Sequence, residues 1–432
     1  MTKINFNLRN VIAAAICLVS LTASVSAWAQ DVQWKKNFGG SDFDYYQSVT
    51  AVSDGVVAAG YSYPSSFGNG DWAGVEGKGG ADAILVKYDN NGNVVWKKNF
   101  GGSDFDYYQS VTAISDGVVA AGSSSASSFG TGDWAGVAGK GNDDAILVKY
   151  DNNGNVVWKK NFGGSDIDYY TSVTAVSDGI VAAGISNSSS FGNGDWAGVT
   201  GKGHWDAILV KYDNNGNVVW KKNFGGSDID YYTSVTAVSD GIVAAGISYP
   251  DSFVTGDWTG ITGKGSIDAI LVKYDNNGNV VWKKNFGGSG GDYYDSVTAV
   301  SDGFVAAGYS GSNSFGNGDW AGVEGKGYWD AILVKYSITT GIEQVNMDAG
   351  ELKIYPNPVK DELTIENGEL TIENVVITDL SGRIVMVVGA GSVGAGVKPA
   401  PTTGGAIINV SALPSGVYFI KVGNMAGKFV KE

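Results

Sequence analysis

The sequence predicts an all-β protein, in which a five-bladed β-propeller is followed by a small Ig-like β-sandwich. The first observation is a repeat of 62 residues, marked by Trp34, Trp96, Trp158, Trp220 and Trp282. The second is that Asp-Gly and Asn-Gly turn signals separate β-rich runs throughout this repeat. The third is a change of composition after Ser337, beyond which a different set of strand patterns begins. A repeat of this length predicts one supersecondary unit that buries its apolar faces against neighbouring units.

Residues 1–29 have the features of a signal peptide. Lys3 and Arg9 give a basic start, an apolar run follows from Val11, and Ala27-Trp28-Ala29 offers a cleavage site with small residues at its first and third positions. We therefore expect the mature chain to be exported. The only cysteine, Cys17, lies in this leader, so neither disulfides nor cysteine-ligated metals are expected in the mature protein.

The charge of the chain limits its partners. The formal net charge is −15, which argues against nucleic acid or an anionic membrane as the partner, because both are bound through clustered Lys and Arg. No other apolar run approaches the length of a membrane span, so a transmembrane protein is not expected. Aromatic residues make up 12% of the chain, too many for a disordered protein.

Each repeat contains four strand signals. In the first repeat, SVTAV from Ser48 and VVAAGYS from Val56 flank Ser53-Asp54-Gly55, which predicts a tight hairpin. AILVKY from Ala83 then leads through DNNG into NVVWKKNF, which predicts a second hairpin. Four antiparallel strands per unit, repeated five times over residues 31–337, favour propeller blades.

The two ends of the repeat region differ in a complementary way. VQWKKNF from Val32 copies the fourth strand of a unit, whereas the last unit stops at DAILVKYS and lacks that strand. We expect residues 32–38 to pair antiparallel with residues 330–337 and close a ring, because an unpaired sheet edge promotes aggregation. An open solenoid or a string of small β units would carry the same repeat without explaining this match.

The five units resemble the β-propeller repeats of secreted bacterial proteins. The resemblance is carried by WKKNFGGSD, SDGVVAAG and DAILVKYDNNGNVVW. It implies the architecture and says little about activity, since propellers host unrelated functions.

The chain beyond the repeats predicts a linker and a second β domain. Residues 338–350 are interpreted as the linker, and alternating strands separated by Asn-Pro, Ser-Gly and Pro-Ser-Gly turns predict a sandwich at 351–432. Two features disturb the pattern: ELTIEN occurs twice, and a Gly- and Ala-rich insertion starts at Val388.

This segment is similar to the type A C-terminal sorting domain of the type IX secretion system of Bacteroidota. The similarity is carried by YPNP from Tyr355, DLSGR from Asp379, LPSGVY from Leu413 and KFVK from Lys428. It implies contact with the type IX secretion machinery, passage through the outer membrane, removal of the domain, and attachment to the cell surface or release. An ordinary sandwich module is the alternative.

The sequence offers little for catalysis. His204 is the only histidine and the mature chain has no thiol, which almost excludes Ser-His, Cys-His and His-rich metal chemistry. Asp42, Asp44, Asp71 and Asp82 recur between repeats, but a glycosidase needs two carboxyls in different environments. Equivalent acids around a ring do not differ in that way, so we expect no enzyme; a secreted glycan-active hydrolase is the alternative.

Calcium is the one cofactor that the sequence leaves open. Asp42, Asp44 and their equivalents in the other repeats could supply oxygen ligands to a hard cation, and capping of backbone amides is the alternative role.

The long loop between the second and third strands is the first candidate binding site. It keeps a Trp beside an Asp in every repeat, a pairing with which proteins hold sugars by stacking and hydrogen bonding. The candidate residues are Trp72, Trp134, Trp196, Trp258 and Trp320, with Asp71, Asp133, Asp195, Asp257 and Asp319. The alternative is that these indoles wedge between blades.

A second candidate site lies where the near-identical repeats disagree. The two residues before the Asp-Ala of the third strand include His204-Trp205 and Tyr328-Trp329, and the position of Glu76 also varies. We expect both positions to lie on one rim that contacts the ligand, with Trp205 and Trp329 as the strongest anchors, because large rigid aromatics dominate binding energies. A loop tip that tolerates any residue is the alternative.

The sequence therefore predicts an exported propeller at the outer-membrane surface or outside the cell, where it binds a glycan or a protein. The alternatives are the hydrolase and a structural surface protein without a discrete ligand.

Overall fold

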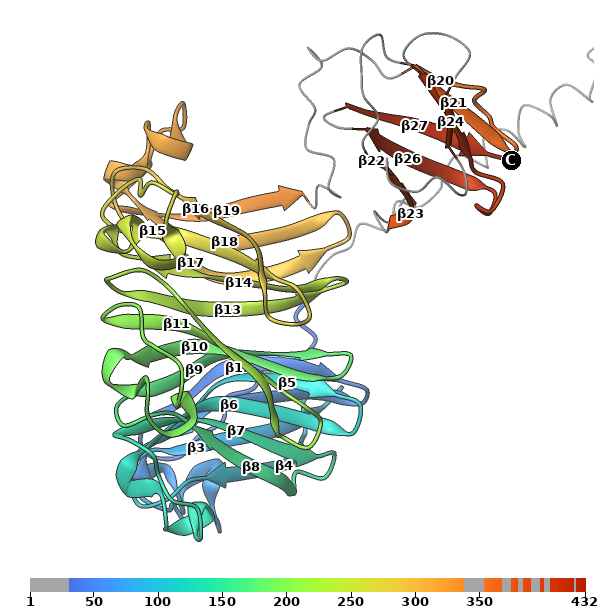
Figure 1. Ribbon diagram of the computed structural model, residues 1–432. Helices are drawn as coiled ribbons and strands as arrows, with labels where there is room; N and C mark the ends of the chain where they lie inside the picture. The colour runs from blue at the N-terminus through green and yellow to red at the C-terminus, as the bar shows by residue number, and fades with distance from the viewer. Residues whose placement is uncertain are drawn as a thin grey trace, which may run out of the picture. The chain divides into compact units, whose positions relative to one another are not determined.

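The computed structural model describes residues 31–337, 353–366, 374–379, 384–389, 397–399, 405–422 and 425–432 (Figure 1). The predicted leader and linker lie outside these residues. Strands and short 3-10 helices are the regular structure of the described part of the chain. The described residues form two compact units. The first comprises residues 31–235, Ile247–Gly263 and Tyr274–Val281, and the second comprises Thr236–Gly246, Lys264–Lys273 and the described residues from Trp282 onward.

The first repeat forms the four-stranded sheet that its turn signals predict. β1 (Asp44–Val52), β2 (Gly55–Ser62), β3 (Asp82–Asp89) and β4 (Val94–Phe100) lie side by side in chain order, and each neighbouring pair is antiparallel. Gly55 has φ +156°, and a Cβ at this position would lie 1.9 Å from the carbonyl oxygen of Tyr88. The Asp-Gly turn therefore requires glycine for space as well as for conformation.

The next three repeats form the same sheet, and all five are consistent with propeller blades. Their strands are β5 (Asp106–Ile114), β6 (Gly117–Ser125), β7 (Asp143–Asp151), β8 (Val156–Phe162), β9 (Asp168–Val176), β10 (Gly179–Asn187), β11 (Trp205–Tyr212), β12 (Val218–Phe224), β13 (Asp230–Val238), β14 (Gly241–Ser248), β15 (Asp268–Tyr274) and β16 (Val280–Phe286). The fifth sheet contains β17 (Asp292–Val300), β18 (Gly303–Gly311) and β19 (Trp329–Ser337).

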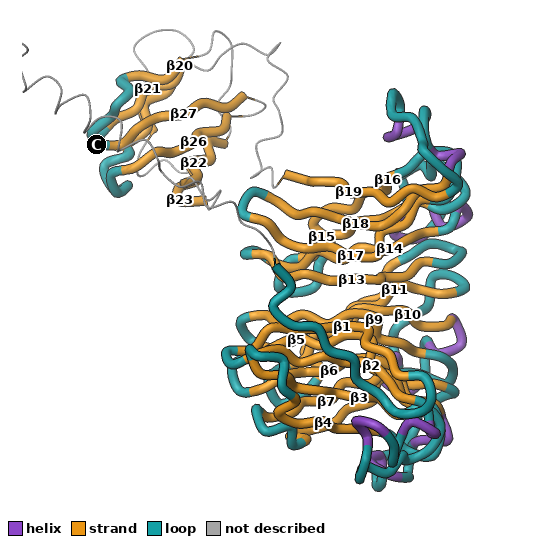
Figure 2. The backbone as a smooth tube through the Cα atoms, turned by 180° about the vertical axis from the view of Figure 1, so that it is seen from behind, coloured by secondary structure: helices purple, strands orange, loops and turns teal. Residues whose placement is uncertain are grey.

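The long loop between the second and third strands holds two short 3-10 helices in every repeat. They are η1 (Pro64–Ser66), η2 (Gly70–Trp72), η3 (Ala126–Ser128), η4 (Gly132–Trp134), η5 (Ser188–Ser190), η6 (Gly194–Trp196), η7 (Pro250–Val254), η8 (Gly256–Trp258), η9 (Ser312–Ser314) and η10 (Gly318–Trp320). Since every loop connects the same two strands, these helices lie at the same end of each sheet, as Figure 2 shows in purple.

The predicted pairing of residues 32–38 with the last strand stays a prediction. In the described residues, the fifth sheet has three strands and residues 31–40 carry no strand. The segment packs on the first sheet, where Trp34 Nε1 donates to the Asn90 carbonyl at 3.2 Å. Trp96 donates to the Asn152 carbonyl in the second repeat at 3.1 Å in the same way. Side-chain packing thus holds the segment without backbone pairing.

The core of the repeat region lies where one sheet faces the next. At the first junction, Val57 and Leu85 of one sheet meet Tyr108 and Val111 of the following sheet in one buried cluster. Corresponding residues form the clusters of later junctions. Because successive side chains of a strand point to opposite faces of its sheet, an internal sheet packs on both of its neighbours.

The C-terminal domain is the β-sandwich that the sequence predicts. Its sheets have the orders β20-β21-β25-β24 and β23-β22-β26-β27. The strands are β20 (Lys353–Tyr355), β21 (Glu362–Glu366), β22 (Asn374–Asp379), β23 (Ile384–Gly389), β24 (Val397–Pro399), β25 (Gly405–Asn409), β26 (Gly416–Val422) and β27 (Met425–Lys431). Leu363 and Ile408 of one sheet share a buried cluster with Ile377 and Phe429 of the other. Asn357 of the YPNP motif accepts a hydrogen bond from Val430 N at 2.9 Å, which joins two of the motifs that carry the family similarity.

Candidate functional site

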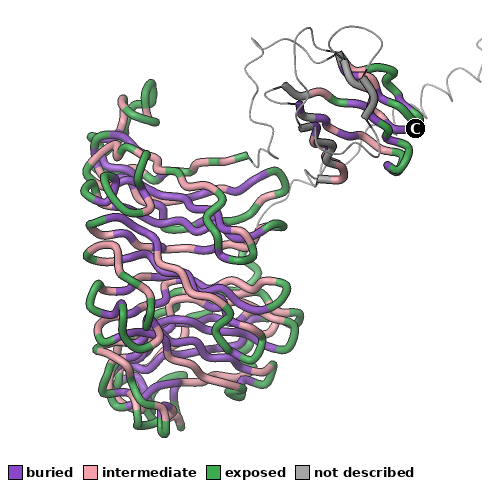
Figure 3. The backbone as a smooth tube through the Cα atoms, in the orientation of Figure 1, coloured by how far each residue is buried: buried purple, intermediate pink, exposed green. Residues whose placement is uncertain are grey.

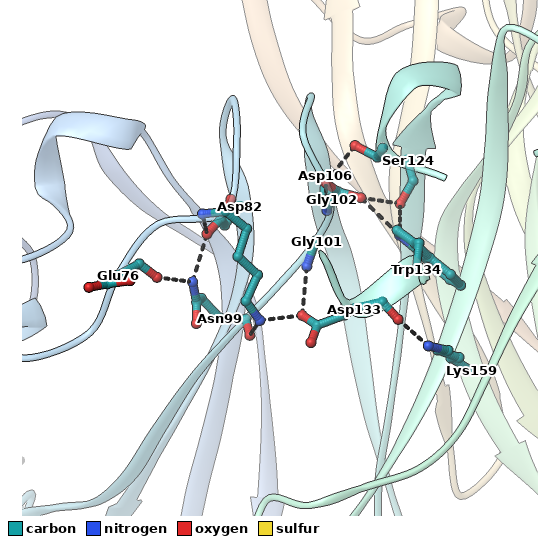
Figure 4. A network of polar contacts seen from close by, with 12 residues as sticks. Glu76, Asp82, Asn99, Gly101, Gly102, Asp106, Ser124, Asp133, Trp134 and Lys159 are labelled. Carbon is teal, nitrogen blue, oxygen red and sulfur yellow. Dashed lines mark hydrogen bonds and ion pairs between the residues drawn. The ribbon is translucent and has the colours of Figure 1, made fainter. Parts of the chain in front are cut away.

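The recurring Asp of the GGSD-DYY segment is a buried acceptor that organises the long loop. The Asp106 carboxylate accepts hydrogen bonds from Gly102 N at 2.9 Å, Ser128 Oγ at 2.8 Å, Ser124 Oγ at 2.5 Å and Trp134 Nε1 at 3.0 Å (Figure 4). Burial raises the pKa of Asp106, and these four donors oppose that rise. Asp44 accepts the equivalent bonds in the first repeat.

Some of these contacts are of the kind that the capping alternative describes. The oxygens of Asp44 and its equivalents face N–H and O–H donors, and Asp42 Oδ1 accepts from Phe43 N at 2.9 Å. Within the described residues, no group of three or more His, Cys, Asp or Glu side chains could hold a metal ion. Calcium binding at Asp42 and Asp44 stays a prediction.

The prediction that the loop tryptophans form the floor of a sugar site is wrong for four of the five repeats. Trp72, Trp134, Trp196 and Trp258 are fully buried, with 0% of each residue exposed. The Trp134 ring packs edge-on against Phe100 of the preceding repeat, with a centroid distance of 4.9 Å. The indoles thus wedge between sheets, which was the alternative, and only Trp320 is half-buried. Because each ring fills the core and its Nε1 is bonded to a carboxylate, no face is left for a ligand.

The Asp beside each of these tryptophans connects consecutive repeats. Asp133 forms an ion pair with Lys78 of the preceding repeat and accepts from Gly101 N at 3.0 Å (Figure 4). Its carbonyl accepts from Lys159. Asp195, Asp257 and Asp319 form the equivalent ion pairs with Lys140, Lys202 and Lys264. Asp71, in the first repeat, accepts from Gly39 N at 3.0 Å. These aspartates stabilise the loops and are not free to bind a sugar.

The variable pair lies at the junction between one repeat and the next. His204 N donates to the carbonyl of Asp228 at 3.1 Å, and Trp205 bridges Ile229 in parallel orientation. Ile229 is the equivalent of Phe43, at a position that also varies between repeats. We call this edge of each junction the variable rim: the residues at or near the start of the first strand, the end of the second and the start of the third.

The predicted rim residues differ in exposure. His204 is exposed and Trp205 is half-buried. Tyr328 is 81% exposed and Trp329 46%, and the Trp329 ring lies against Tyr309 with centroids 5.3 Å apart. Of the predicted anchors, Trp329 is thus the more accessible to a ligand. The Glu76 position is not joined to the rim by a contact in the described residues; its carbonyl accepts instead from the Asn99 side chain.

Sequence reasoning missed the largest aromatic group on the rim. At the first two repeats, a chain of ring contacts joins six residues with centroid distances of 4.8–6.1 Å: Phe43, Tyr45, Tyr61, Tyr63, Phe105 and Tyr107. Phe43 is 61% exposed and Phe105 41%. The available signal was that positions 43, 61 and 63 also vary between repeats, as Tyr61 and Tyr63 become Ser123 and Ser125. We call these six residues the aromatic cluster.

Two interactions show how the rim can use polar groups. Desolvation, followed by the nearby hydroxyls of Tyr63 and Tyr61, raises the pKa of Tyr107 to about 12, so its hydroxyl stays protonated at neutral pH. At the second junction, the Tyr169 hydroxyl donates to Asp143 of the variable pair at 2.6 Å. The rim therefore combines flat apolar rings with hydroxyl and carboxylate groups.

Comparison with known proteins identifies the C-terminal domain. Residues 353–432 match the family of secretion system C-terminal sorting domains, here of the type IX system. The chain is 23% identical over 245 residues to the regulatory protein FlaEY of Caulobacter vibrioides, a match that covers 53% of this chain and 26% of the relative. The chain thus spans about a quarter of that relative's length.

Solved structures give only remote similarity. A Synechocystis apocarotenoid oxygenase mutant has a TM-score of 0.29 at 11% identity, covering 59% of this chain and 52% of that one. The computationally designed Ika8 protein has a TM-score of 0.30 at 9% identity, covering 91% of this chain and 98% of that one. Among the described residues, no helix is long and apolar enough to cross a membrane. The sorting domain indicates that the protein is exported, to the cell surface or the medium, through interaction with the type IX machinery.

Proposed function

We propose that this exported β-repeat protein is a binding module that recognises glycans through its variable rim, without catalysing a reaction on them. The single observation that carries the proposal is the aromatic cluster at the first two repeats, in which rings of Phe43, Tyr45 and Phe105 are each more than 40% exposed. Isolated exposed apolar residues are common on proteins, but a contiguous group of six rings is not.

The chemistry of the cluster suits a sugar. Phe105 and Tyr107 stack nearly in parallel, with an interplanar angle of 6° and centroids 6.0 Å apart. Tyr61 meets Tyr107 edge-on at 4.8 Å. Flat rings pack against the apolar face of a pyranose, and tyrosine hydroxyls bond its hydroxyl groups. The cluster thus offers both contacts without a charged group, which favours a neutral glycan.

Divergence between repeats supports the same site. Repeats that are otherwise almost identical differ at positions 43, 61, 63, 80 and 81. The first repeat carries Phe43, Tyr61, Tyr63, Gly80 and Ala81, and the third carries Ile167, Ile185, Asn187, His204 and Trp205. Backbone hydrogen bonds join several of these positions, as Asn187 N donates to Ile167 O at 2.9 Å. A rim whose residues change while its scaffold stays constant is suited to recognition.

Binding without catalysis fits the use of the recurrent carboxylates. Asp106 and Asp133, with their equivalents, accept hydrogen bonds from the protein's own donors or form ion pairs with its lysines. A general acid and a nucleophile must instead face the scissile bond.

The experiment is a glycan-array screen of the purified protein, followed by calorimetric titration of the best neutral oligosaccharide. Replacing Tyr63 and Phe105 together by Ala should weaken binding at least tenfold, or about 1.4 kcal/mol, because both rings lie in the cluster. The matched control is Val254→Ala, which removes an apolar side chain that is 77% exposed and distant in sequence from the cluster. Equal affinity of the double variant and the control for the glycan would refute the proposal, as would release of reducing ends from it.

A further inference from the structure

The outer strand of the second sheet borders a cleft that the third repeat helps to form. β8 is the edge strand of its sheet and is half-buried in its middle, whereas β6 and β7 are buried along most of their length (Figure 3). The cleft has a volume of about 330 Å³, and its lining includes Lys140, Lys159, Lys160 and Asp195. Because β8 is an edge strand, side chains from both of its faces reach the cleft along the free edge. All lining residues belong to the first compact unit.

The three lysines of this cleft have different partners. Lys140 Nζ forms an ion pair with Asp195, which neutralises its charge. Lys159 Nζ donates to the Asp133 carbonyl, a partner that carries no charge. For Lys160 Nζ, the described residues provide neither an ion pair nor a hydrogen bond. Three ammonium groups therefore line the cleft with one carboxylate, so the cleft is positively charged in a protein whose net charge is −15.

The Asp213 carboxylate interacts with Lys160 only at longer range, because its oxygens accept hydrogen bonds within its own turn. Its Oδ1 accepts from Asn215 N at 2.9 Å and from Asn217 N at 2.8 Å, and its Oδ2 accepts from the Asn217 side chain at 2.9 Å. These hydrogen bonds from Asn217 lower the pKa of Asp213, and the charge of Lys160 adds a smaller contribution. The ammonium group of Lys160 therefore remains available to an anion from outside the protein.

The turn of the third repeat fixes the position of the Lys160 side chain. A Cβ on Gly216 would lie 2.8 Å from Lys160 Cε and 3.1 Å from Trp158 Cδ2. The lysine stem thus lies against a glycine, beside an indole ring, in space that a larger residue of the turn would occupy. Because this packing holds the stem before a ligand arrives, binding costs less side-chain entropy than it would at a freely moving lysine.

The same arrangement recurs at two other junctions of the first unit. Lys98 at the first junction and Lys222 at the third are the equivalents of Lys160. A Cβ on Gly154 would lie 2.9 Å from Lys98 Cε, and one on Gly278 would lie 3.0 Å from Lys222 Cε. The described residues give neither lysine a hydrogen bond or an ion pair. Three junctions therefore present an ammonium group in the same way.

We propose that each of these junctions binds an oxyanion, a carboxylate or sulfate group, through Lys160 or its equivalent. An ammonium group donates up to three hydrogen bonds and accepts none, so an anion with several oxygens is the ligand that matches it. Hydrogen bonds between an ammonium group and an oxyanion are about twice as strong as those between neutral groups. At the second junction, Lys159 adds a positive charge to the same cleft.

Two sources can supply such a group. A cleft of about 330 Å³ holds a monosaccharide as well as a bare ion, so the oxyanion belongs to an acidic sugar or is a free inorganic ion. The lysines are not part of the aromatic cluster, so this site is independent of the proposed neutral glycan. Lysines on an edge strand also protect a sheet from pairing with another chain, and that role alone predicts no bound anion.

Calorimetric titration of the full chain with sodium sulfate and, separately, with sodium glucuronate tests the proposal at constant ionic strength. The triple variant Lys98→Gln, Lys160→Gln, Lys222→Gln removes one ammonium group from each junction. We expect it to bind the preferred probe at least tenfold more weakly than the parent, because the charge-assisted hydrogen bonds are lost. The corresponding triple Lys→Arg variant keeps the charges and should bind within about threefold of the parent.

The charge-matched control is Lys326→Gln, Lys353→Gln, Lys360→Gln, which removes three exposed lysines outside these junctions and should bind as the parent does. Equal affinity of the two Gln variants, loss of binding in the Arg variant, or no binding of either probe to the parent overturns the proposal. Tighter binding of glucuronate than of sulfate supports it with an acidic sugar as the source, and the reverse order supports it with a free inorganic ion.

Discussion

The burial of the tryptophan in the long loop could not be predicted from the sequence around it. A Trp beside an Asp on a glycine-rich loop has the composition of a sugar site, but Trp134 is buried and donates to Asp106, 28 residues earlier in the chain. Burial of a loop residue depends on the neighbouring repeat, through Phe100, and not on local sequence. The capping role of the aspartates was foreseen as an alternative because Asp commonly bonds nearby backbone amides.

The buried carboxyl of Asp82 leads to a prediction of pH dependence. Its Oδ1 is buried without a hydrogen-bond partner in the described structure, and desolvation raises its pKa to about 6. Because the folded pKa lies above the ordinary value of 3.8, the stabilisation is fully present below pH 3.8 and is lost as the pH rises through 6. We expect this group to lower the free energy of unfolding by about 2 kcal/mol between pH 4 and pH 7.

Urea unfolding of Asp82→Asn at both pH values checks this prediction, because the variant should lose less stability over that interval than the parent. The control is Asp54→Asn. Asp54 is exposed, and its hydrogen bond with Lys87 lowers its pKa, so any contribution has the opposite sign and is lost as the pH falls. An identical pH dependence of the parent and Asp82→Asn would contradict the raised pKa.

At the scale of the element, the hairpins were predictable because their signals are local. Asp-Gly between β-rich runs and the DNNG turn both lie where the structure forms antiparallel pairs. The edge pairing predicted for residues 32–38 depends instead on a partner about 300 residues away in the sequence. The WKKNF sequence is compatible with two partners, a strand beside it and a sheet beneath it, and the structure describes its contact with the sheet.

Alanine substitution at two glycines of the second repeat distinguishes the cost of backbone strain from the cost of a steric clash. Gly117 and Gly130 both have positive φ, at +156° and +81°. A Cβ on Gly117 would lie 1.9 Å from the Tyr150 carbonyl oxygen, whereas one on Gly130 would meet nothing within 4 Å. Gly117→Ala should therefore lower the free energy of unfolding by about 3 kcal/mol or more, and Gly130→Ala by about 1 kcal/mol. Urea unfolding of both variants makes the comparison, and equal losses would show that the β5-β6 turn relaxes freely.

At the scale of the whole molecule, export was the most predictable property. Four short motifs in the right order indicated the sorting domain, and the family match at residues 353–432 confirms it. The ligand was not predictable, because the rim that distinguishes the repeats is assembled from residues up to about 40 positions apart in each unit. Such a surface exists only after the sheets have formed.

Removing residues 353–432 should abolish export while leaving the repeat region folded. The reason is that the two parts have separate cores, one shared by the sheets of the sandwich and the others formed between repeats. Cell fractionation should find the truncated protein inside the outer membrane, with unchanged protease resistance of the repeat region. Its appearance at the cell surface or in the medium would show that another part of the chain directs export.

The ion pairs between loops have a consequence for how the gene can change. Each joins a Lys of one repeat to an Asp of the next through the same sequence spacing of 55 residues. Loss of residues 96–157 by unequal crossing-over would bring Lys78 to the place of Lys140, opposite Asp195, and recreate a junction already present. Gain of a unit does the same. Natural length variants of this gene should therefore differ by whole multiples of 62 codons. Each variant should keep the same first and last repeats.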